Sequence, residues 1–242
     1  MFEGMAKAHP SYLRRLECGS VFVRARPSGN KVALISGGGS GHEPAHVGFV
    51  GKGMLDCAVA GSIFTSPTPD QILEGIKAIA NEKGVLMIVK NYTGDIMNFE
   101  MAADLARDEG ILVDHVVTND DVAVQDSLYT TGRRGVAGTF FVHKIAGAKA
   151  EQGAPLEEVK AAAQRVIDNV RTMGAAIAPC TVPAAGKPGF VLADDEMEIG
   201  IGIHGEPGRH REKVAPAAEI AERLVTPILA ELTALTELET SG

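Results

Sequence analysis

Residues Lys31–Pro44 have the sequence KVALISGGGSGHEP, an apolar run that passes directly into a run of glycines. Lys31–Ile35 predicts a short buried strand, and Ser36–Pro44 predicts a loop whose bare backbone amides can approach a small ligand. Helical patterns separate this strand from three further apolar runs, at Leu55–Ala60, Val85–Val89 and Ile111–Val117. This alternation predicts an α/β fold, in which a parallel sheet has helices on both faces.

The pattern changes after Gly135, where two successive helices are predicted, at Val136–Ala150 and Leu156–Met173. Two strands and a final helix follow, at Ala175–Pro179, Glu198–Ile203 and about Pro216–Leu235. Two strands are too few to form a stable sheet alone. We therefore expect an α/β domain over residues 1–173 and an incomplete second, smaller α/β domain over residues 174–242.

The composition restricts the possible partners. Lysine and arginine number 23 against 31 aspartate and glutamate residues, and the net charge of −8 argues against nucleic acid and anionic membranes. Cys18, Cys57 and Cys180 have neither metal-binding nor redox spacing, which favours a cytoplasmic location. No apolar run approaches the length of about 20 residues that a membrane span needs. Glycine is the anomaly, at 28 of 242 residues.

Polar side chains stand where the predicted strands end. Ser66 follows the second strand, Lys90 and Asp95 follow the third, and His204 follows Glu198–Ile203. Ligands of an open parallel sheet bind outside the carboxyl ends of its strands. The pattern therefore predicts a ligand pocket at this edge, with ordinary polar turns as the alternative.

The glycine run does not match the familiar nucleotide motifs. A Gly-x-Gly-x-x-Gly pattern that starts at Gly37 has His42 at its last position, and no Gly-x-x-x-x-Gly-Lys-Ser/Thr occurs. His42–His46 (HEPAH) does fit His-Glu-x-x-His, in which two histidines bind zinc and Glu43 would be the base. A zinc hydrolase is thus one alternative. The preferred interpretation places His42 in the pocket and His46 in packing.

Single residues leave two interpretations open. Asp95 is the type of group that takes a proton from a substrate hydroxyl, or it is an Asx cap. Lys90 either orients an oxyanion or caps the strand end, and Ser66 either contacts a ligand or caps a helix. His204 is a candidate base or nucleophile, or a histidine satisfied in a turn. We expect the Arg133–Arg134 pair at a solvated helix terminus, with phosphate binding as the alternative.

Several strings, taken together, resemble one family: the K subunit, or N-terminal kinase domain, of dihydroxyacetone kinases. They occur in the family's order and extend from about Ala6 to Gly208. The matching strings are AKAHP (Ala6–Pro10), SGGGSGHEP (Ser36–Pro44), IFTSPTPD (Ile63–Asp70), KNYTGD (Lys90–Asp95), DVAVQDSLY (Asp121–Tyr129), GRRGV (Gly132–Val136), CTVPAAGKP (Cys180–Pro188) and GIHGEPG (Gly202–Gly208).

The resemblance implies a mechanism. In this family a histidine nitrogen adds to the ketone carbon of dihydroxyacetone, and His204 occupies that motif. Asp95 would take the proton from the terminal hydroxyl, and His42 would bind the substrate and assist proton transfer. The positions that line the ketose pocket are matched by Gly39, Ser66 and Lys90. A covalent bond would supply the orientation that a triose's few contacts cannot, and it would distinguish the ketone from glycerol, which cannot form the adduct.

The resemblance also implies partners. This chain would bind no nucleotide or metal itself; ADP and magnesium would sit on an L-type subunit recharged from phosphoenolpyruvate, or ATP and magnesium on a C-terminal domain. A homodimer is expected because an exposed sheet edge invites pairing. Family members continue with strands beyond the final helix, so we expect the second domain to be truncated here. A non-catalytic ketose sensor or co-regulator is the second functional alternative.

Overall fold

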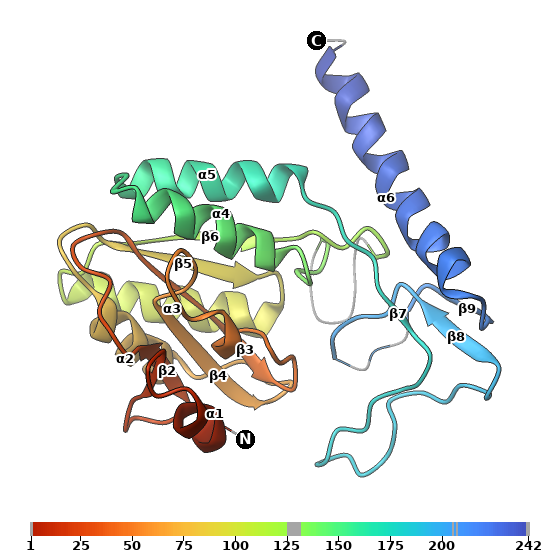
Figure 1. Ribbon diagram of the computed structural model, residues 1–242, viewed down its shortest axis with the longest axis horizontal. Helices are drawn as coiled ribbons and strands as arrows, with labels where there is room; N and C mark the ends of the chain where they lie inside the picture. The colour runs from red at the N-terminus through yellow and green to blue at the C-terminus, as the bar shows by residue number, and fades with distance from the viewer. Residues whose placement is uncertain (1, 125–131, 205, 207, 241–242) are drawn as a thin grey trace.

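The computed structural model describes residues 2–124, 132–204, 206 and 208–240, with side chains described through Ala234. Its main sheet has the strand order β1-β2-β4-β3-β5-β6. Four neighbouring strands are parallel, and they match the four predicted apolar runs: β3 (Ala33–Ser40), β4 (Cys57–Ile63), β5 (Val85–Lys90) and β6 (Val113–Thr118). The predicted parallel sheet is therefore confirmed (Figure 1).

Helices cover both faces of this sheet, as the sequence predicts. Along β5, Leu86 and Ile88 belong to one buried cluster and Met87 to another, because successive strand residues point to opposite faces. The first cluster is completed by α4 (Thr139–Glu151) and α5 (Leu156–Asn169). The second is completed by α2 (Pro69–Ile79) and α3 (Thr93–Asp108). Two cores thus hold the strands in place.

The glycine run lies inside a strand, which corrects the prediction of a loop from Ser36. β3 continues to Ser40, with Gly37 opposite Val59 and Gly39 opposite Gly61 of β4. Glycine is a poor strand residue by itself. Here hydrogen bonds to the central neighbour β4 override that preference, so the strand extends to the edge where the side chains of the site gather.

The N-terminal segment adds elements that the sequence analysis did not predict. Helix α1 (Phe2–Ala8) precedes the short strands β1 (Leu13–Arg15) and β2 (Val21–Arg24). β2 pairs antiparallel with β4, and Phe2 packs its ring 5.3 Å from that of Phe22. These strands are too short to carry a clear period. A 3-10 turn, η1 (Val47–Phe49), follows β3.

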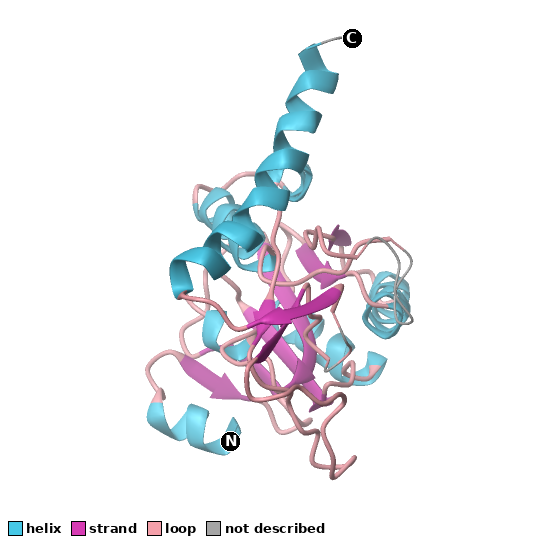
Figure 2. Ribbon diagram, turned by 90° about the vertical axis from the view of Figure 1, so that its right-hand side faces the viewer, coloured by secondary structure: helices cyan, strands magenta, loops and turns pink. Residues whose placement is uncertain are grey.

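The second sheet also differs from the prediction of two strands. It has three antiparallel strands: β7 (Ala175–Ala176), β8 (Glu196–Ile199) and β9 (His210–Lys213). β9 has the sequence HREK and lacks the apolar residues by which strands are recognised. Helix α6 (Ala217–Thr240) then extends away from both sheets (Figures 1 and 2). The expected boundary at residue 173 falls between α5 and β7.

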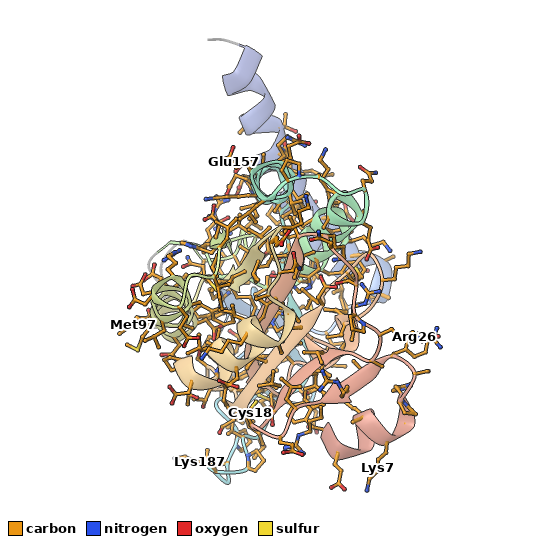
Figure 3. The ribbon with its side chains drawn as sticks, turned by 90° about the vertical axis from the view of Figure 1, so that its left-hand side faces the viewer. Lys7, Cys18, Arg26, Met97, Glu157 and Lys187 are labelled. Atoms are coloured by element: carbon orange, nitrogen blue, oxygen red, sulfur yellow. The ribbon has the colours of Figure 1, made fainter. Side chains whose placement is uncertain are left out.

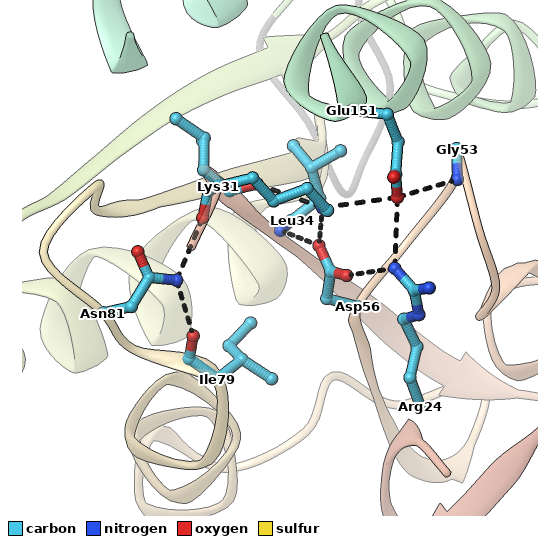
Figure 4. A network of polar contacts seen from close by, with 9 residues as sticks. Arg24, Lys31, Leu34, Gly53, Asp56, Ile79, Asn81 and Glu151 are labelled. Atoms are coloured by element: carbon cyan, nitrogen blue, oxygen red, sulfur yellow. Dashed lines mark hydrogen bonds and ion pairs between the residues drawn. The ribbon is translucent and has the colours of Figure 1, made fainter. Parts of the chain in front are cut away.

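A buried ionic network closes the amino end of the main sheet (Figure 4). Asp56 accepts hydrogen bonds from Lys31 Nζ at 2.6 Å, from the Leu34 amide at 2.9 Å and from Arg24 Nη1 at 3.1 Å. Arg24 also contacts Glu151 of α4 at 3.1 Å. This end is occupied by structural contacts, which leaves the opposite, carboxyl end for a ligand.

The surface is charged, and Lys7, Arg26 and Glu157 point away from the body of the molecule (Figure 3). Cys18 and Cys180 are exposed and Cys57 is buried in β4. Within the part of the chain that the structure describes, no helix is both long and apolar enough to cross a membrane.

Candidate functional site

The carboxyl end of β3 is overlain closely by the loop that follows β4. A Cβ atom on Gly39 would lie 2.5 Å from the Thr65 nitrogen and 2.7 Å from the Phe64 Cα, distances that real Cβ atoms essentially never show. Only glycine permits this approach. The Phe64 backbone has a φ of 54°, the left-handed region that a bulky residue rarely adopts. The loop is thereby bent over the glycines.

Ser66 lies in this loop and faces the start of α3. Asn98 of α3 donates a hydrogen bond to the Pro67 carbonyl at 2.8 Å and so ties the loop to the helix. The N-cap of α2 is Thr68, whose amide donates to Gln71 at 3.3 Å. Ser66 therefore does not cap the helix, which removes that alternative; its hydroxyl donates to the Pro67 carbonyl at 3.4 Å and lies close enough to Asp95 to affect the pKa of that carboxyl group.

Asp95 is buried in the first turn of α3, close to Ser66 and Lys90. The N-cap of α3 is Tyr92, so Asp95 is not the capping residue. Burial raises the pKa of its carboxyl group, while the Lys90 charge and the Ser66 hydroxyl oppose that rise. A carboxylate with a raised pKa is a stronger base, which suits proton abstraction from a hydroxyl.

Lys90 ends β5 with its ammonium group inside the protein. Its Nζ atom is buried and has no hydrogen-bond partner among the described residues, and it lies 5.7 Å from the centre of the Tyr92 ring. Burial lowers the Lys90 pKa, and the charges of Asp95 and Asp120 oppose that shift. A buried donor without a partner costs free energy unless a ligand satisfies it.

His204 lies among three rings. Its ring centre is 4.5 Å from that of Tyr92, 4.8 Å from that of His42 and 5.7 Å from that of Phe64, each in an edge-to-face arrangement. Burial, followed by the charges of Lys90 and Arg134, lowers the pKa of His204 to about 4. Its imidazole is therefore neutral at pH 7 and carries a free lone pair.

A cavity of about 640 Å³ opens beside these residues. Four of the six predicted site residues line it, namely Gly39, Ser66, Asp95 and His204. Its remaining walls come from the loop after β4, the start of α3 and Val182: Ile63, Phe64, Thr65, Tyr92, Thr93, Gly94, Asn98 and Val182. Segments far apart in the sequence thus meet at one cavity at the carboxyl end of the sheet.

The other two predicted residues, His42 and Lys90, line a neighbouring cavity of about 290 Å³. His42 still belongs to the same cluster, because its ring contacts His204 and stacks on Phe64 at 4.9 Å. Burial, with the nearby Lys90 and His204, lowers the His42 pKa to about 3. His42 is thus a second neutral imidazole beside His204.

The zinc interpretation of His42–His46 is not supported by the geometry. These residues form turns rather than a helix, so the two imidazoles do not share one helical face. Glu43 accepts a hydrogen bond from the Gly41 amide at 3.0 Å. His46 is buried, 3.3 Å from Ser36 Oγ and 5.4 Å from the His143 ring, as the packing interpretation predicts. No metal-binding group of three side chains occurs among the described residues.

Arg134 is buried and Arg133 is only partly exposed, which corrects the expected solvated helix terminus. Arg133 forms an ion pair with Glu231 of α6, and Arg134 forms a buried ion pair with Asp121. Sequence reasoning also missed Phe64 and Tyr92 as ring neighbours of His204, because no spacing rule connects them. Gly205 and Pro207 of the GIHGEPG string, and 125–129 of DVAVQDSLY, lie outside the described residues.

Comparisons with known proteins place the chain in a family. The chain is 60% identical over 231 residues to the Listeria innocua "PTS-dependent dihydroxyacetone kinase 1, dihydroxyacetone-binding subunit DhaK", covering 96% of this chain and 70% of that protein. Among solved structures, the "Dihydroxyacetone kinase operon co-activator Dha-DhaQ" matches with a TM-score of 0.89 at 40% identity, covering 98% of this chain and 72% of the other.

A second solved structure is the dihydroxyacetone kinase of C. freundii, at 41% identity with a TM-score of 0.85. That match covers 95% of this chain but 43% of the longer kinase. Residues 3–241 match the Dak1 domain. With a match over nearly its whole length, the chain belongs to the Dak1 domain family.

Proposed function

We propose that this chain is the dihydroxyacetone-binding part of a ketose kinase and holds its substrate covalently on His204. The observation that carries the proposal is the position of the His204 imidazole, which lies at a cavity that the buried carboxylate of Asp95 also lines. The Listeria innocua relative is named as a dihydroxyacetone-binding subunit, which supports this choice of substrate.

The covalent step is an addition to the ketone. The lone pair of the unprotonated His204 nitrogen forms a bond to the carbonyl carbon, and the C=O π bond breaks. The oxygen gains a proton and the imidazole loses its N–H proton, so the product is a neutral hemiaminal with atoms and charge balanced. A protonated imidazole has no lone pair to donate, which is why the low pKa of His204 matters.

The remaining residues orient the triose and move one proton. Asp95 would accept the proton of a terminal hydroxyl, with Ser66 close to the carboxylate. Lys90 would donate to a substrate oxygen from its Nζ atom, which has no hydrogen-bond partner in the described part of the chain, and Gly39 keeps the cavity wall free of a side chain. His42 would hydrogen-bond the bound substrate and assist the proton transfer at the carbonyl oxygen.

The phosphoryl donor would come from another subunit or domain. A nucleotide with magnesium, bound to an L-type subunit or to a C-terminal ATP domain, would supply the phosphoryl group. The C. freundii kinase, of which this chain covers 43%, is long enough to carry such a domain itself. This chain would therefore bind ketose but transfer nothing alone. A homodimer and a cytoplasmic location remain predictions.

Carbon-13 NMR with dihydroxyacetone labelled at the carbonyl carbon tests the proposal. Binding should replace the ketone signal by that of a carbon bonded to oxygen and nitrogen. His204→Ala should abolish the new signal, while the exposed His210→Ala should leave it unchanged. Asp95→Asn should keep the adduct but lose phosphoryl transfer when a partner subunit and donor are added. An adduct that survives in His204→Ala would refute the covalent role.

A non-catalytic ketose sensor is the second candidate. The observation in its favour is the match to a structure named as an operon co-activator, at a TM-score of 0.89. Both candidates predict the adduct, and they differ in phosphoryl transfer. Transfer with an L-type subunit and its donor would support the kinase, whereas a stable adduct without transfer would support the sensor.

A further inference from the structure

Arg134 lies buried beneath the segment that carries His204. Its side chain is 1% exposed, and its guanidinium contacts three groups from two separate segments. Nε donates to Asp121 Oδ2 at 2.7 Å, Nη2 donates to the Gly200 carbonyl at 2.9 Å, and Nη1 donates to Glu206 Oε1 at 3.2 Å. The planar group therefore joins the end of the main sheet to the segment around His204.

Glu206 connects Arg134 to the backbone of His204. Its second carboxylate oxygen, Oε2, accepts a hydrogen bond from the backbone amide of His204. Arg134 thus holds the segment on both sides of His204: at the Gly200 carbonyl before it, and through Glu206 after it. Neither Arg134 nor Glu206 lines the cavity in which the substrate would lie.

The glycine at position 202 makes room for this ion pair. A Cβ atom there would collide with the carboxylate of Glu206 and with Arg134 Nη1. The backbone therefore passes directly against the two charged groups, which is possible only without a side chain. The reason for a glycine at position 202 is therefore its close contact with the ion pair, and not the backbone conformation of a turn.

A gain in stability does not explain why the charged groups of Arg134, Asp121 and Glu206 are buried. Asp121 is 2% exposed and Glu206 is 11% exposed, so two carboxylates and one guanidinium are withdrawn from water. Desolvation offsets much of the attraction in such an arrangement, which makes buried ion pairs weak contributors to stability. Their fixed directions are instead well suited to holding a backbone segment in one position.

We propose that Arg134 is a positioning residue, which orients His204 through Glu206 so that its imidazole meets the ketone carbon. The proposal rests on the covalent role of His204 proposed above. Arg134 touches no substrate atom. Its effect is on the adduct, because a misplaced nucleophile forms its bond less readily, whereas contacts made by the rest of the cavity are unaffected.

The experiment compares Arg134→Gln and Arg134→Lys with Arg133→Gln, a matched control whose partner is Glu231 of α6. Adduct formation is measured by carbon-13 NMR with labelled dihydroxyacetone, and noncovalent binding is measured by saturation-transfer NMR with glycerol. Both Arg134 variants should weaken the adduct by roughly tenfold or more, with glycerol binding within about twofold of wild type. Arg133→Gln should match wild type in both measurements.

Glu206→Gln is the milder variant if Arg134→Gln fails to fold. It keeps an oxygen that can accept from His204 but removes the ion pair, so a smaller loss of adduct is expected. The double variant should lose no more adduct than Arg134→Gln alone, because the two residues act in series. Additive losses, an unchanged adduct, or equal losses of glycerol and ketose would overturn the proposal. A wild-type protein without adduct would refute the function proposed above, and the positioning role with it.

Discussion

An exposed imidazole titrates near pH 6.5, and most histidines are half protonated there. His204 departs from this value because it is packed against Tyr92 and His42 and lies near two cations, Lys90 and Arg134. Burial first, and then the two positive charges, disfavour the imidazolium form. The chemistry of the residue is therefore set by its surroundings and not by its type.

A pH series of the adduct follows from this shift. The lone pair of His204 is free wherever the imidazole is neutral, which for a pKa of about 4 includes pH 5.5. We expect the carbon-13 adduct signal to stay constant from pH 7.5 to 5.5 and to fall only below about pH 5. A histidine with the ordinary pKa would be about 90% protonated at pH 5.5. Loss of signal centred near pH 6.5, with an unchanged circular dichroism spectrum, would contradict the shift.

At the scale of elements, the amino ends of β3 and β4 are held by ionic contacts, whereas their carboxyl ends border the cavity. Their amino ends are joined by Asp56, which contacts both Lys31 and the Leu34 amide. Their carboxyl ends carry Gly39 and Gly61, which lie opposite each other and leave space for the loop after β4. The sheet is therefore tied at one end by charge and open to a ligand at the other.

Asp56→Asn tests the tied end. The substitution removes the nearer counter-charge of the buried Lys31, at 2.6 Å, and leaves Glu151 at 3.9 Å; breaking a buried ion pair costs roughly 3–5 kcal/mol. We expect a loss of this size in the free energy of unfolding, measured by urea denaturation. Asp104→Asn is the control, since its pair with Arg107 is 77% and 44% exposed and should contribute at most about 1 kcal/mol. Equal losses in the two variants would show that the network contributes no more than a surface pair.

At the scale of the whole molecule, two buried histidines, His46 and His143, and two half-buried ones, His42 and His204, gather between β3, α4 and the His204 segment. Burial lowers the pKa of His143 to about 3, assisted by Lys90, and lowers that of His46 well below 6.5. His42 and His204 are lowered as well. The unfolded chain binds protons at these residues near pH 6.5, whereas the folded chain does not, so stability must fall as the pH drops below that value.

His143→Leu tests how much His143 contributes to the fall in the free energy of unfolding at low pH. Both ring nitrogens of His143 are buried and have no hydrogen-bond partner among the described residues, so no described hydrogen bond is lost. Between about pH 6 and pH 4 the wild type should lose about 1.4 kcal/mol more per pH unit than the variant. Urea unfolding at several pH values measures the slopes. The exposed His9→Leu should keep the wild-type slope; an identical slope in His143→Leu would refute the assignment.

The sequence alone was sufficient for the parallel core, because four apolar runs predicted β3 to β6. Family strings named His42, Asp95 and His204 as candidate site residues before any geometry was available. The structure brings these three side chains close together, and their roles in chemistry stay predictions. Short edge strands and the polar strand β9 escaped prediction, since their pairing depends on neighbours distant in the chain.

Tertiary structure alone decided how the site is held. In the folded chain the glycine run lies inside β3, and His42–His46 form turns instead of the helix that a zinc motif needs. The fold also places the Tyr92 ring in contact with His204. It also turned Arg134 from an expected surface residue into a buried link to Glu206. The sequence determines which groups are available for chemistry. Only the folded chain decides which of them lose water and meet, because burial and contact depend on segments that the sequence separates.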